Sequence, residues 1–114
     1  MDVFSALSDP TRRSIVEILA ATDFLTATEI YENFQTSPQS ISKHLRILRD
    51  SNLVQVKKNA QQRLYSMNGD TLRQVEDWVR NVGNRWSRRL DALDSVLRSD
   101  KKEKEKDSSG GDFV

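Results

Sequence analysis

The 114-residue sequence has no cysteine, one histidine, two prolines and four glycines. Without cysteine, the chain can form no disulfide bond, no thiolate metal site and no cysteine nucleophile. It also lacks a long apolar run, so we expect neither a secretory signal in the opening MDVFSALSDPTRR nor a helix that spans a membrane. The sequence therefore predicts a cytoplasmic protein with one folded domain and no membrane partner.

Groups that could carry out catalysis are equally scarce. The single histidine, His44, has no neighbours in the sequence that suggest a nucleophile–base pair or a set of metal ligands. A glycine-rich phosphate-binding loop is also missing. We therefore expect no enzyme activity, no catalytic residue, no metal and no cofactor.

Positive charge is concentrated in one part of the chain. The net charge of the whole chain is only +1, but residues 37–67 contain six basic residues against a single acid, Asp50. This segment is therefore +5 and the remainder is −4. A basic segment in an otherwise acidic protein is typical of a face that binds a polyanion, and a solvated lysine and arginine surface is the alternative interpretation.

Four short helices are predicted before residue 51. The first ends near Asp9, and Pro10 begins the second. Thr26 and Glu29 have the spacing of a capping box at the start of the third helix. Val3, Phe4 and Leu7 indicate the first helix. Ile15, Ile18 and Leu19 form the stripe that the second helix is expected to bury, and Ile30 and Phe34 share a face of the third.

The fourth helix is predicted over residues 38–50. Ser37 is suited to cap it, Pro38 to occupy its first position, and Asn52 to adopt the left-handed conformation just after its end. Because the loop before it is short, the third and fourth helices form a helix-turn-helix unit. The strand-forming segments LVQVKK and QRLYSM then predict a hairpin over residues 53–67 with its turn near Asn59 and Ala60. The predicted fold class is mainly α with a two-stranded β wing, a winged helix-turn-helix in the order of four helices, two strands and a fifth helix.

The fifth helix, predicted at about residues 70–98, carries apolar residues at nearly heptad spacing. We call this row the seam; its members are Leu72, Val75, Val79, Val82, Trp86, Leu90, Leu93 and Leu97. A heptad row favours a partner helix, so we predict a homodimer interface made of the seam together with Val3 and Phe4. Packing of the seam on the chain's own first helix is the alternative. Gly83 within this helix indicates either a close helix crossing or a local bend.

Two segments make up the predicted domain organisation. Residues 1–98 form the winged domain with its dimerisation helix, and residues 99–114 form a charged tail that we predict to be disordered.

The fourth helix has two different faces. Ile41, Leu45 and Leu48 share one narrow sector, while a polar stripe of longer side chains lies opposite. Such side chains suit DNA base edges and phosphates, although any surface helix displays polar residues. The predicted contacts in this helix are Gln39, Ser40, Ser42 and Lys43 for bases, Arg46 for phosphate or mixed contacts, Ser37 at the helix start, and His44 for packing or a phosphate. Lys57, Lys58 and Arg63 of the wing are predicted to contact the flanking backbone or an adjacent minor groove.

Several segments together resemble the ArsR/SmtB family of bacterial and archaeal winged-helix repressors. The opening FSALSDPTRRSIVEIL resembles the family's first two helices, and SPQSISKHLRILRDSNLV resembles its recognition helix. QRLYSMN resembles the returning strand of the wing, and the last helix with Trp86 and RRLDAL resembles a subgroup with a long dimer helix. The resemblance covers roughly residues 3–68.

The resemblance implies a homodimer that binds a palindromic operator in double-stranded DNA, represses transcription at the nucleoid, and leaves DNA on a signal from a small-molecule or protein effector. Metal-sensing members hold the ion with cysteines on the third helix or with histidine and acidic ligands on the last. This sequence has no cysteine, and its last helix offers Glu76, Asp77, Asp91 and Asp94 without histidine, so we expect no metal sensing.

A different class of function is a winged-helix module that binds other proteins without specific DNA binding. The depletion of acids from residues 37–67 argues for DNA, since a purely protein-binding module does not require it. A small-molecule sensor, with a pocket between the last helix and the winged core, is a variant of the DNA-binding hypothesis. Regulation as a repressor rather than an activator rests on the resemblance alone.

Overall fold

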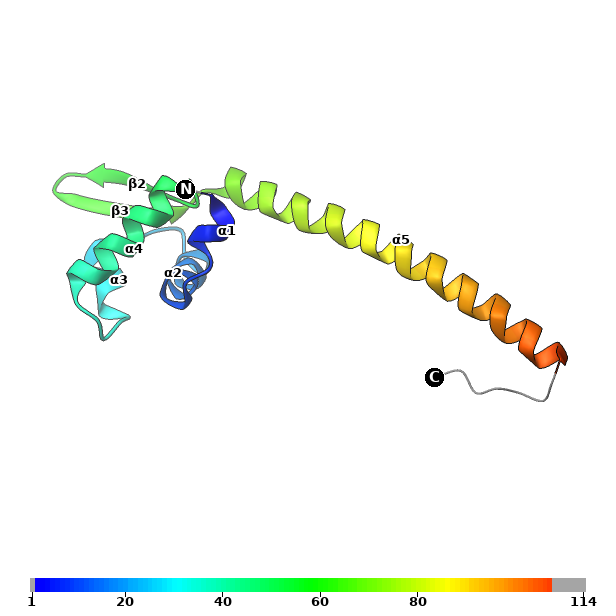
Figure 1. Ribbon diagram of the computed structural model, residues 1–114. Coiled ribbons are helices and arrows are strands. Elements are labelled where there is room, and N and C mark those ends of the chain that lie inside the picture. Colours follow the sequence, from blue (N-terminus) through cyan, green and yellow to red (C-terminus); the bar gives the residue numbers. More distant parts are fainter. Residues whose placement is uncertain (1, 108–114) are drawn as a thin grey trace. The chain divides into compact units, whose positions relative to one another are not determined.

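The computed structural model describes the backbone of residues 2–107 and the side chains of residues 2–99. The elements are α1 (Val3–Ala6), α2 (Pro10–Ala20), β1 (Leu25–Thr26), α3 (Ala27–Glu32), α4 (Pro38–Asp50), β2 (Val54–Asn59), β3 (Gln62–Met67) and α5 (Gly69–Asp107) (Figure 1). The predicted order of helices with an antiparallel wing is confirmed. The chain divides into two compact units, one that extends to Val75 and one that begins at Glu76.

Local capping groups fix where the helices begin. At α3, the Thr26 hydroxyl accepts from the Glu29 N–H at 3.2 Å, and the Glu29 carboxylate accepts from the Thr26 N–H at 3.0 Å. At α4, the Ser37 hydroxyl accepts from the Ser40 N–H at 3.2 Å. These bonds satisfy backbone donors that have no partner inside a helix, so both predicted helix starts are confirmed.

The end of α4 is equally well defined. Asn52 has φ = 63°, the left-handed conformation that asparagine tolerates better than most residues. Its N–H donates to Arg49 O at 2.9 Å, and the Leu53 N–H donates to Leu48 O at 3.1 Å. This pair of bonds is the Schellman pattern, which ends the helix and turns the chain into β2.

The hydrophobic core lies inside the winged unit, between the helices and the sheet. The buried apolar side chains are Ala6, Ile15, Leu19, Ile30, Ile41, Leu45, Leu48, Leu53, Val54 and Tyr65. Burial of each large aliphatic residue contributes about 1.5–3 kcal/mol. Ile18, which was expected to be buried, is only half-buried, and so is Phe34, because both lie at the margin of this core. Phe34 also follows the end of α3 rather than belonging to it.

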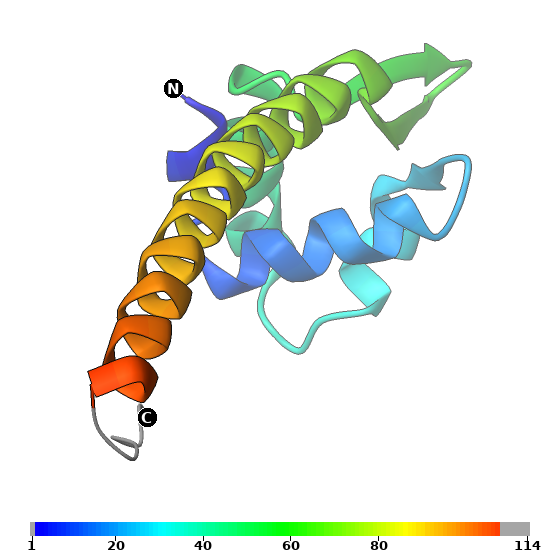
Figure 2. The ribbon, with the colours of Figure 1, turned by 90° about the vertical axis from the view of Figure 1, so that its right-hand side faces the viewer.

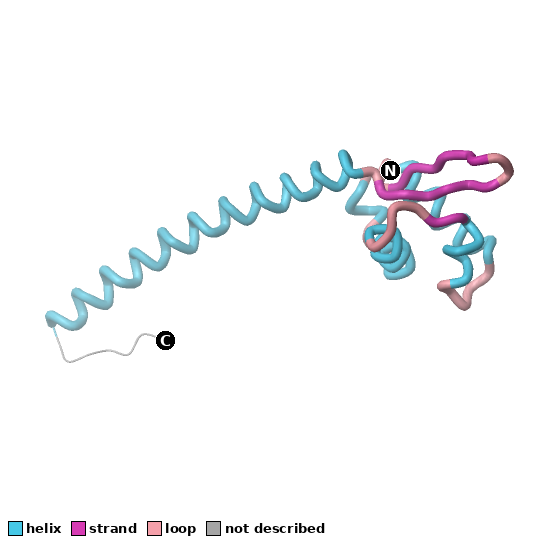
Figure 3. Tube along the Cα trace, turned by 180° about the vertical axis from the view of Figure 1, so that it is seen from behind, coloured by secondary structure: helices cyan, strands magenta, loops and turns pink. Residues whose placement is uncertain are grey.

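The wing is part of a three-stranded antiparallel sheet with the strand order β1-β3-β2 (Figure 3). Its register runs from Val54 opposite Met67 to Asn59 opposite Gln62, which confirms the predicted hairpin. Ala60 adopts φ = 58° at the tip, a conformation that glycine adopts without steric cost. The sequence did not predict β1, because two residues are too short to show the alternation of a strand.

The last helix, α5, is longer than the sequence predicted. It runs to Asp107, so the first part of the predicted disordered tail is helical, and residues 108–114 of that tail lie outside the described residues. The segment KKEKEKD consists mostly of strong helix formers, which explains the extension. The helix passes through Gly83 without a break (Figures 1 and 2). In the described part of the chain, no helix combines the length and apolarity required to cross a membrane.

Candidate nucleic-acid interface

Helix α4 buries one face in the core and presents the other to solvent. Ile41, Leu45 and Leu48 are at most 1% exposed. The polar stripe on the opposite side is exposed, namely Gln39, Ser42, Lys43 and Arg46. The core therefore fixes the rotation of α4 about its axis, and with it the direction of the polar stripe. This arrangement is the one that the 3.6-residue periodicity predicted.

The two serines at the start of α4 are placed differently from the rest of the stripe. The Ser37 hydroxyl already accepts the Ser40 N–H as the helix cap, although the residue itself is exposed. Ser40 is half-buried. Of the predicted base-reading residues, Gln39, Ser42 and Lys43 are thus the most accessible.

A shallow depression of about 360 Å³ lies beside the stripe, where α3 meets α4. Its lining comes from Tyr31 of α3 and from Pro38, Gln39, Ser42, Lys43 and Arg46 of α4. Sequence reasoning did not single out Tyr31. The only available signal was its place in α3, one residue after the buried Ile30.

The wing separates its basic residues between two faces of the hairpin. Lys58 and Arg63 are directly opposed across the strands, while Lys57 is opposed to Leu64. Side chains alternate along a strand, so Lys58 and Arg63 extend from the face that carries the buried Tyr65, and Lys57 extends from the other. Two like charges directly opposite one another destabilise a hairpin. A bound anion would relieve that repulsion.

Among the described side chains, some arginines of α5 form ion pairs, whereas the basic residues of the stripe and the wing do not. Arg73, Arg80 and Arg98 each pair with an acid on the same helix. Among the side chains of residues 2–99, none of the five basic residues on the stripe and the wing has such a partner. These five are Lys43, Arg46, Lys57, Lys58 and Arg63. Their charge is therefore free to act on an anion from outside.

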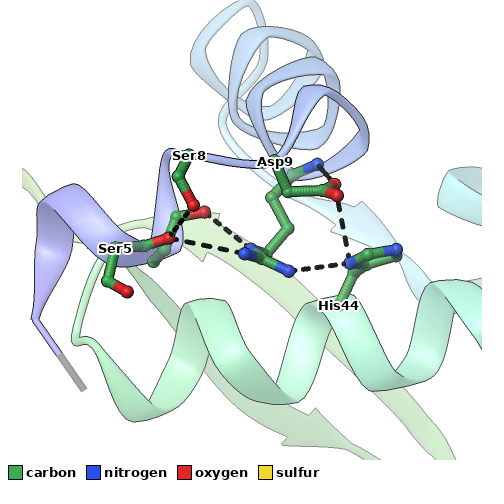
Figure 4. A network of polar contacts seen from close by, with 6 residues as sticks. Ser5, Ser8, Asp9 and His44 are labelled. Atoms are coloured by element: carbon green, nitrogen blue, oxygen red, sulfur yellow. Dashed lines mark hydrogen bonds and ion pairs between the residues drawn. The ribbon is translucent and has the colours of Figure 1, made fainter.

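His44 joins α4 to the start of α2 through a polar network (Figure 4). Its Nδ1 lies 3.2 Å from Arg12 Nη1 and 3.8 Å from Asp9 Oδ2. Arg12 also donates from Nε to Ala6 O at 2.6 Å and from Nη2 to Ser5 O at 3.4 Å. Because arginine has only donors, the Nδ1 of a neutral His44 accepts from Arg12. His44 thus fastens α4 to α1 and α2, in agreement with the predicted packing role, and its phosphate contact stays a prediction.

Two carboxylates in the winged unit are held in the charged form. The backbone N–H of Arg12 donates to Asp9 at 3.0 Å and is the main reason why the pKa of Asp9 lies below its ordinary value. The positive charge of the Arg12 side chain acts in the same direction, and desolvation by partial burial opposes it. The hydrogen bonds of Thr26 lower the pKa of Glu29 in the same way. A carboxyl group whose pKa is lowered by folding stabilises the fold above its unfolded pKa, and this contribution is lost as the pH falls through the folded pKa.

We therefore expect the free energy of unfolding of the wild-type protein to decline below about pH 4. The free energy of unfolding of the Asp9→Asn variant should decline less steeply over the same range. Asparagine still caps a helix, so the variant removes the charge while it keeps the cap. Urea unfolding of both proteins between pH 7 and pH 3 measures the difference. Parallel curves for the two proteins would show that Asp9 contributes nothing to the pH dependence.

Three of the four acids that the sequence offered as metal ligands on α5 are paired with arginines. Glu76 and Asp77 pair with Arg80, and Asp94 pairs with Arg98. Within the described residues, no three histidine, cysteine or acidic side chains are arranged to hold a metal ion.

An apolar surface follows α5 along its exposed side. Val79, Val82, Trp86, Leu90 and Leu93 of the seam are 45–59% exposed. Leu72 is 38% exposed, and Val75 and Leu97 are half-buried. The sequence did not single out Trp78 and Val96, which are 53% and 56% exposed on the same helix. In the winged unit, Phe4 of the predicted interface is 49% exposed and Val3 is half-buried.

A helix-turn-helix whose second helix presents an accessible polar and basic stripe, followed by a basic hairpin, defines a winged-helix DNA-binding protein. Comparison with known proteins agrees with this class. Residues 7–57 match a family model described as a helix-turn-helix domain.

Similarity to named proteins shows which family the chain belongs to. The chain is 39% identical to the transcriptional repressor SdpR of Bacillus subtilis (strain 168) over 84 residues, which cover 74% of this chain and 92% of that protein. It is 34% identical to the arsenical resistance operon repressor of Staphylococcus xylosus over 70 residues, which cover 61% of this chain and 66% of that protein. An ArsR-like transcriptional regulator from Rhodococcus sp. RHA1 has a similar structure, with a TM-score of 0.71, 33% identity, and coverage of 82% of this chain and 88% of that one.

The chain belongs to the ArsR/SmtB family of winged helix-turn-helix transcriptional regulators. It is a DNA-binding regulator of transcription rather than an enzyme.

Proposed function

We propose that this protein is a homodimeric repressor that binds an inverted-repeat operator through α4 and the wing. The observation that carries the proposal is that α4 and the wing together present five accessible basic side chains, none of which has an ion-pair partner among the described side chains. A surface of this kind lowers its electrostatic energy when it contacts phosphates and releases their counterions.

Each part of the interface takes a role that follows from its chemistry. Gln39, Ser42 and Lys43, in the first two turns of α4, read base edges in the major groove. Arg46, further along the helix, makes phosphate or mixed contacts. Ser37 and Ser40 lie at the edge of the same surface and contribute less, because one hydroxyl serves as the helix cap and the other residue is half-buried.

The wing holds the flanking DNA. Lys58 and Arg63 face each other across the strands, so a phosphate between them would remove an unfavourable interaction of the free protein. Lys57 points from the other face of the hairpin and reaches a different phosphate. Both contacts position the protein on DNA without reading its sequence.

Dimerisation through the seam supplies the two-fold symmetry that an inverted repeat requires. The exposed apolar side chains of α5 gain most from a second copy of the same helix, since a two-fold axis brings identical patches together. Gly83 supports a close approach, because a Cβ atom at this position would meet nothing within 4 Å in the same chain. The helix runs unbroken here, so a contact with the partner explains the glycine better than a bend does. Two recognition helices about 34–36 Å apart would enter successive major grooves.

Repression follows from the names of the relatives, which are repressors. A dimer seated on an operator would exclude other proteins from that DNA. We propose that the protein works in the cytoplasm, where its DNA lies, and that a small-molecule or protein effector releases it. A metal effector does not fit Glu76, Asp77 and Asp94, because these acids are paired with arginines on the same helix.

A protein-binding module without DNA contacts is the competing function. Such a module would not require unpaired basic residues on α4, nor two opposed cations in the wing. The exposed apolar row of α5 fits either function, so only the basic surface separates them.

The salt dependence of DNA binding tests the role of the wing. We expect the log–log slope for a mixed-sequence duplex to become shallower by up to about 3.6 in Lys57→Gln/Lys58→Gln, because two cations are removed from each of two protomers. Fluorescence anisotropy between 50 and 300 mM salt measures the slope. Arg80→Gln is the matched control and keeps the wild-type slope, because Arg80 is already paired on α5. A wild-type protein that binds no DNA at low salt would exclude the proposed function.

A further inference from the structure

Tyr31 is an aromatic side chain of α3 that borders the polar stripe of α4. Its ring packs against the core as a partly buried member, yet it also lines the depression beside the α4 stripe. Its hydroxyl forms no hydrogen bond with another described residue. Since no polar side-chain atom among the described residues is buried without a partner, this hydroxyl must be in contact with solvent. The ring is therefore anchored while the hydroxyl is accessible. The hydroxyl can therefore donate a hydrogen bond to a group outside the protein.

The depression on the α4 side of Tyr31 suits one negatively charged oxygen group. It is lined by the donors of Tyr31, Gln39 and Ser42 and by two cations, Lys43 and Arg46, with no acid among the lining residues. Neither cation has an ion-pair partner among the described side chains. A shallow, open hollow cannot enclose a free small molecule, but it can seat a group that projects from a larger surface.

A second depression of about 650 Å³ lies on the other side of Tyr31, between the start of α3 and the wing tip. Its lining includes Thr28, Gln61 and Arg63, but also Glu29, whose carboxylate is held in place and ionised by the capping box. A fixed negative charge disfavours a phosphate there. The anion therefore belongs on the α4 side of Tyr31, where the lining is wholly basic and neutral.

The position of α3 indicates which anion this is. In helix-turn-helix proteins the first helix of the unit crosses the DNA backbone while the second lies in the major groove. Here α3 is the first helix, and Tyr31 is the residue that it contributes to the hollow shared with α4. We infer that Tyr31 donates a hydrogen bond to one backbone phosphate of the DNA, and that Arg46 supplies the positive charge for the same phosphate. This inference rests on the proposed DNA-binding function and adds a contact from α3 that is separate from base reading.

Because its side chain is rigid, Tyr31 can hold a phosphate in one position, which a flexible lysine could not do. Its ring is held by the core and has two side-chain torsions, so little entropy is lost when its hydroxyl bonds a phosphate. The phosphate then fixes how deeply α4 sits in the groove, and Gln39 and Lys43 are left free to read bases. Tyr31 thus acts as a positioning contact for the recognition helix.

The test compares Tyr31→Phe, Arg46→Gln and the double variant on a 30-base-pair mixed-sequence duplex. Tyr31→Phe removes only the hydroxyl, so we expect affinity to fall about tenfold with no change in the salt slope, because the variant lacks a hydrogen bond to a charged group but keeps every cation. Arg46→Gln should make the slope shallower by about 0.9 for each phosphate that is no longer neutralised. The two effects should be less than additive in the double variant, because both residues hold the same phosphate.

Tyr65→Phe is the matched control, since Tyr65 is a buried core residue outside the hollow and its variant should keep wild-type DNA affinity. Thermal unfolding shows whether Tyr31→Phe is folded like the wild type. A folded Tyr31→Phe protein with unchanged affinity would overturn the inference, and so would fully additive effects in the double variant. If the wild-type protein itself binds no duplex, this result contradicts the proposed DNA-binding function and not the role of Tyr31 in particular.

Discussion

Replacing Gln39 or Lys43 by alanine is expected to abolish the preference of the protein for its operator while the dimer remains folded. Both side chains are exposed on the early turns of α4, and the core packing of Ile41 and Leu45 on the opposite face is untouched by either change. A good bidentate contact between a side chain and a base is worth about 1–3 kcal/mol of discrimination. Because the operator is symmetric, each substitution removes the contact from both half-sites.

The measurement is the ratio of Kd values for the operator and for a scrambled duplex of equal length. Lys57→Ala is the informative control, because removal of a phosphate contact should weaken binding to both duplexes alike and leave the ratio unchanged. Circular dichroism and sedimentation check that each variant is folded and dimeric. Retention of the wild-type ratio by both Gln39→Ala and Lys43→Ala would show that α4 does not read the sequence in the proposed way.

Trp86→Arg is expected to convert the dimer into a monomer. Trp86 lies near the middle of the seam and is 59% exposed, so in the dimer it would be the largest side chain covered by the partner. A two-fold interface would receive two new charges, one from each protomer, and desolvation of unpaired charge costs several kcal/mol for each ion. Sedimentation equilibrium should report half of the wild-type mass, and operator affinity should fall with it.

Asn84→Arg provides the comparison for this substitution. Asn84 is exposed on the same helix, two residues away and on the side opposite the seam, so the same new charge should leave the dimer intact. A Trp86→Arg protein that sediments as a dimer would remove the seam from the interface.

Local signals explain why most of the fold could be predicted from the sequence. The capping pair Thr26 and Glu29, the Ser37-Pro38 start and the left-handed Asn52 each act within a few residues of their own position. The amphipathic pattern of α4 likewise fixed which side chains would be buried. Features of this kind require no knowledge of distant parts of the chain.

Other features depend on interactions that no local pattern reveals. Strand β1 exists because Leu25 and Thr26 meet Tyr65 and Leu64 in a distant segment. The length of α5 was underestimated because its charged end was interpreted from composition as disordered, whereas helix propensity extends it to Asp107.

The DNA-binding surface also has some features that local sequence patterns predict and others that depend on distant parts of the chain. Five lysines and arginines of α4 and the wing were predicted to contact DNA from charge and periodicity, and the structure places all five in accessible positions. The opposition of Lys58 and Arg63 depends on the strand register. The link between His44 and Arg12 and the place of Tyr31 in the α4 hollow both require tertiary packing, which is why neither was foreseen.

Selection of random duplex DNA by the purified protein tests the central claim most directly. The bound sequences are recovered and the enriched duplex is titrated against a scrambled one at physiological salt. A dimeric repressor predicts an inverted repeat bound at least about a thousandfold more tightly than the scrambled duplex. Failure to enrich any sequence, with only weak and salt-sensitive binding to all duplexes, would contradict operator recognition and favour the protein-binding module.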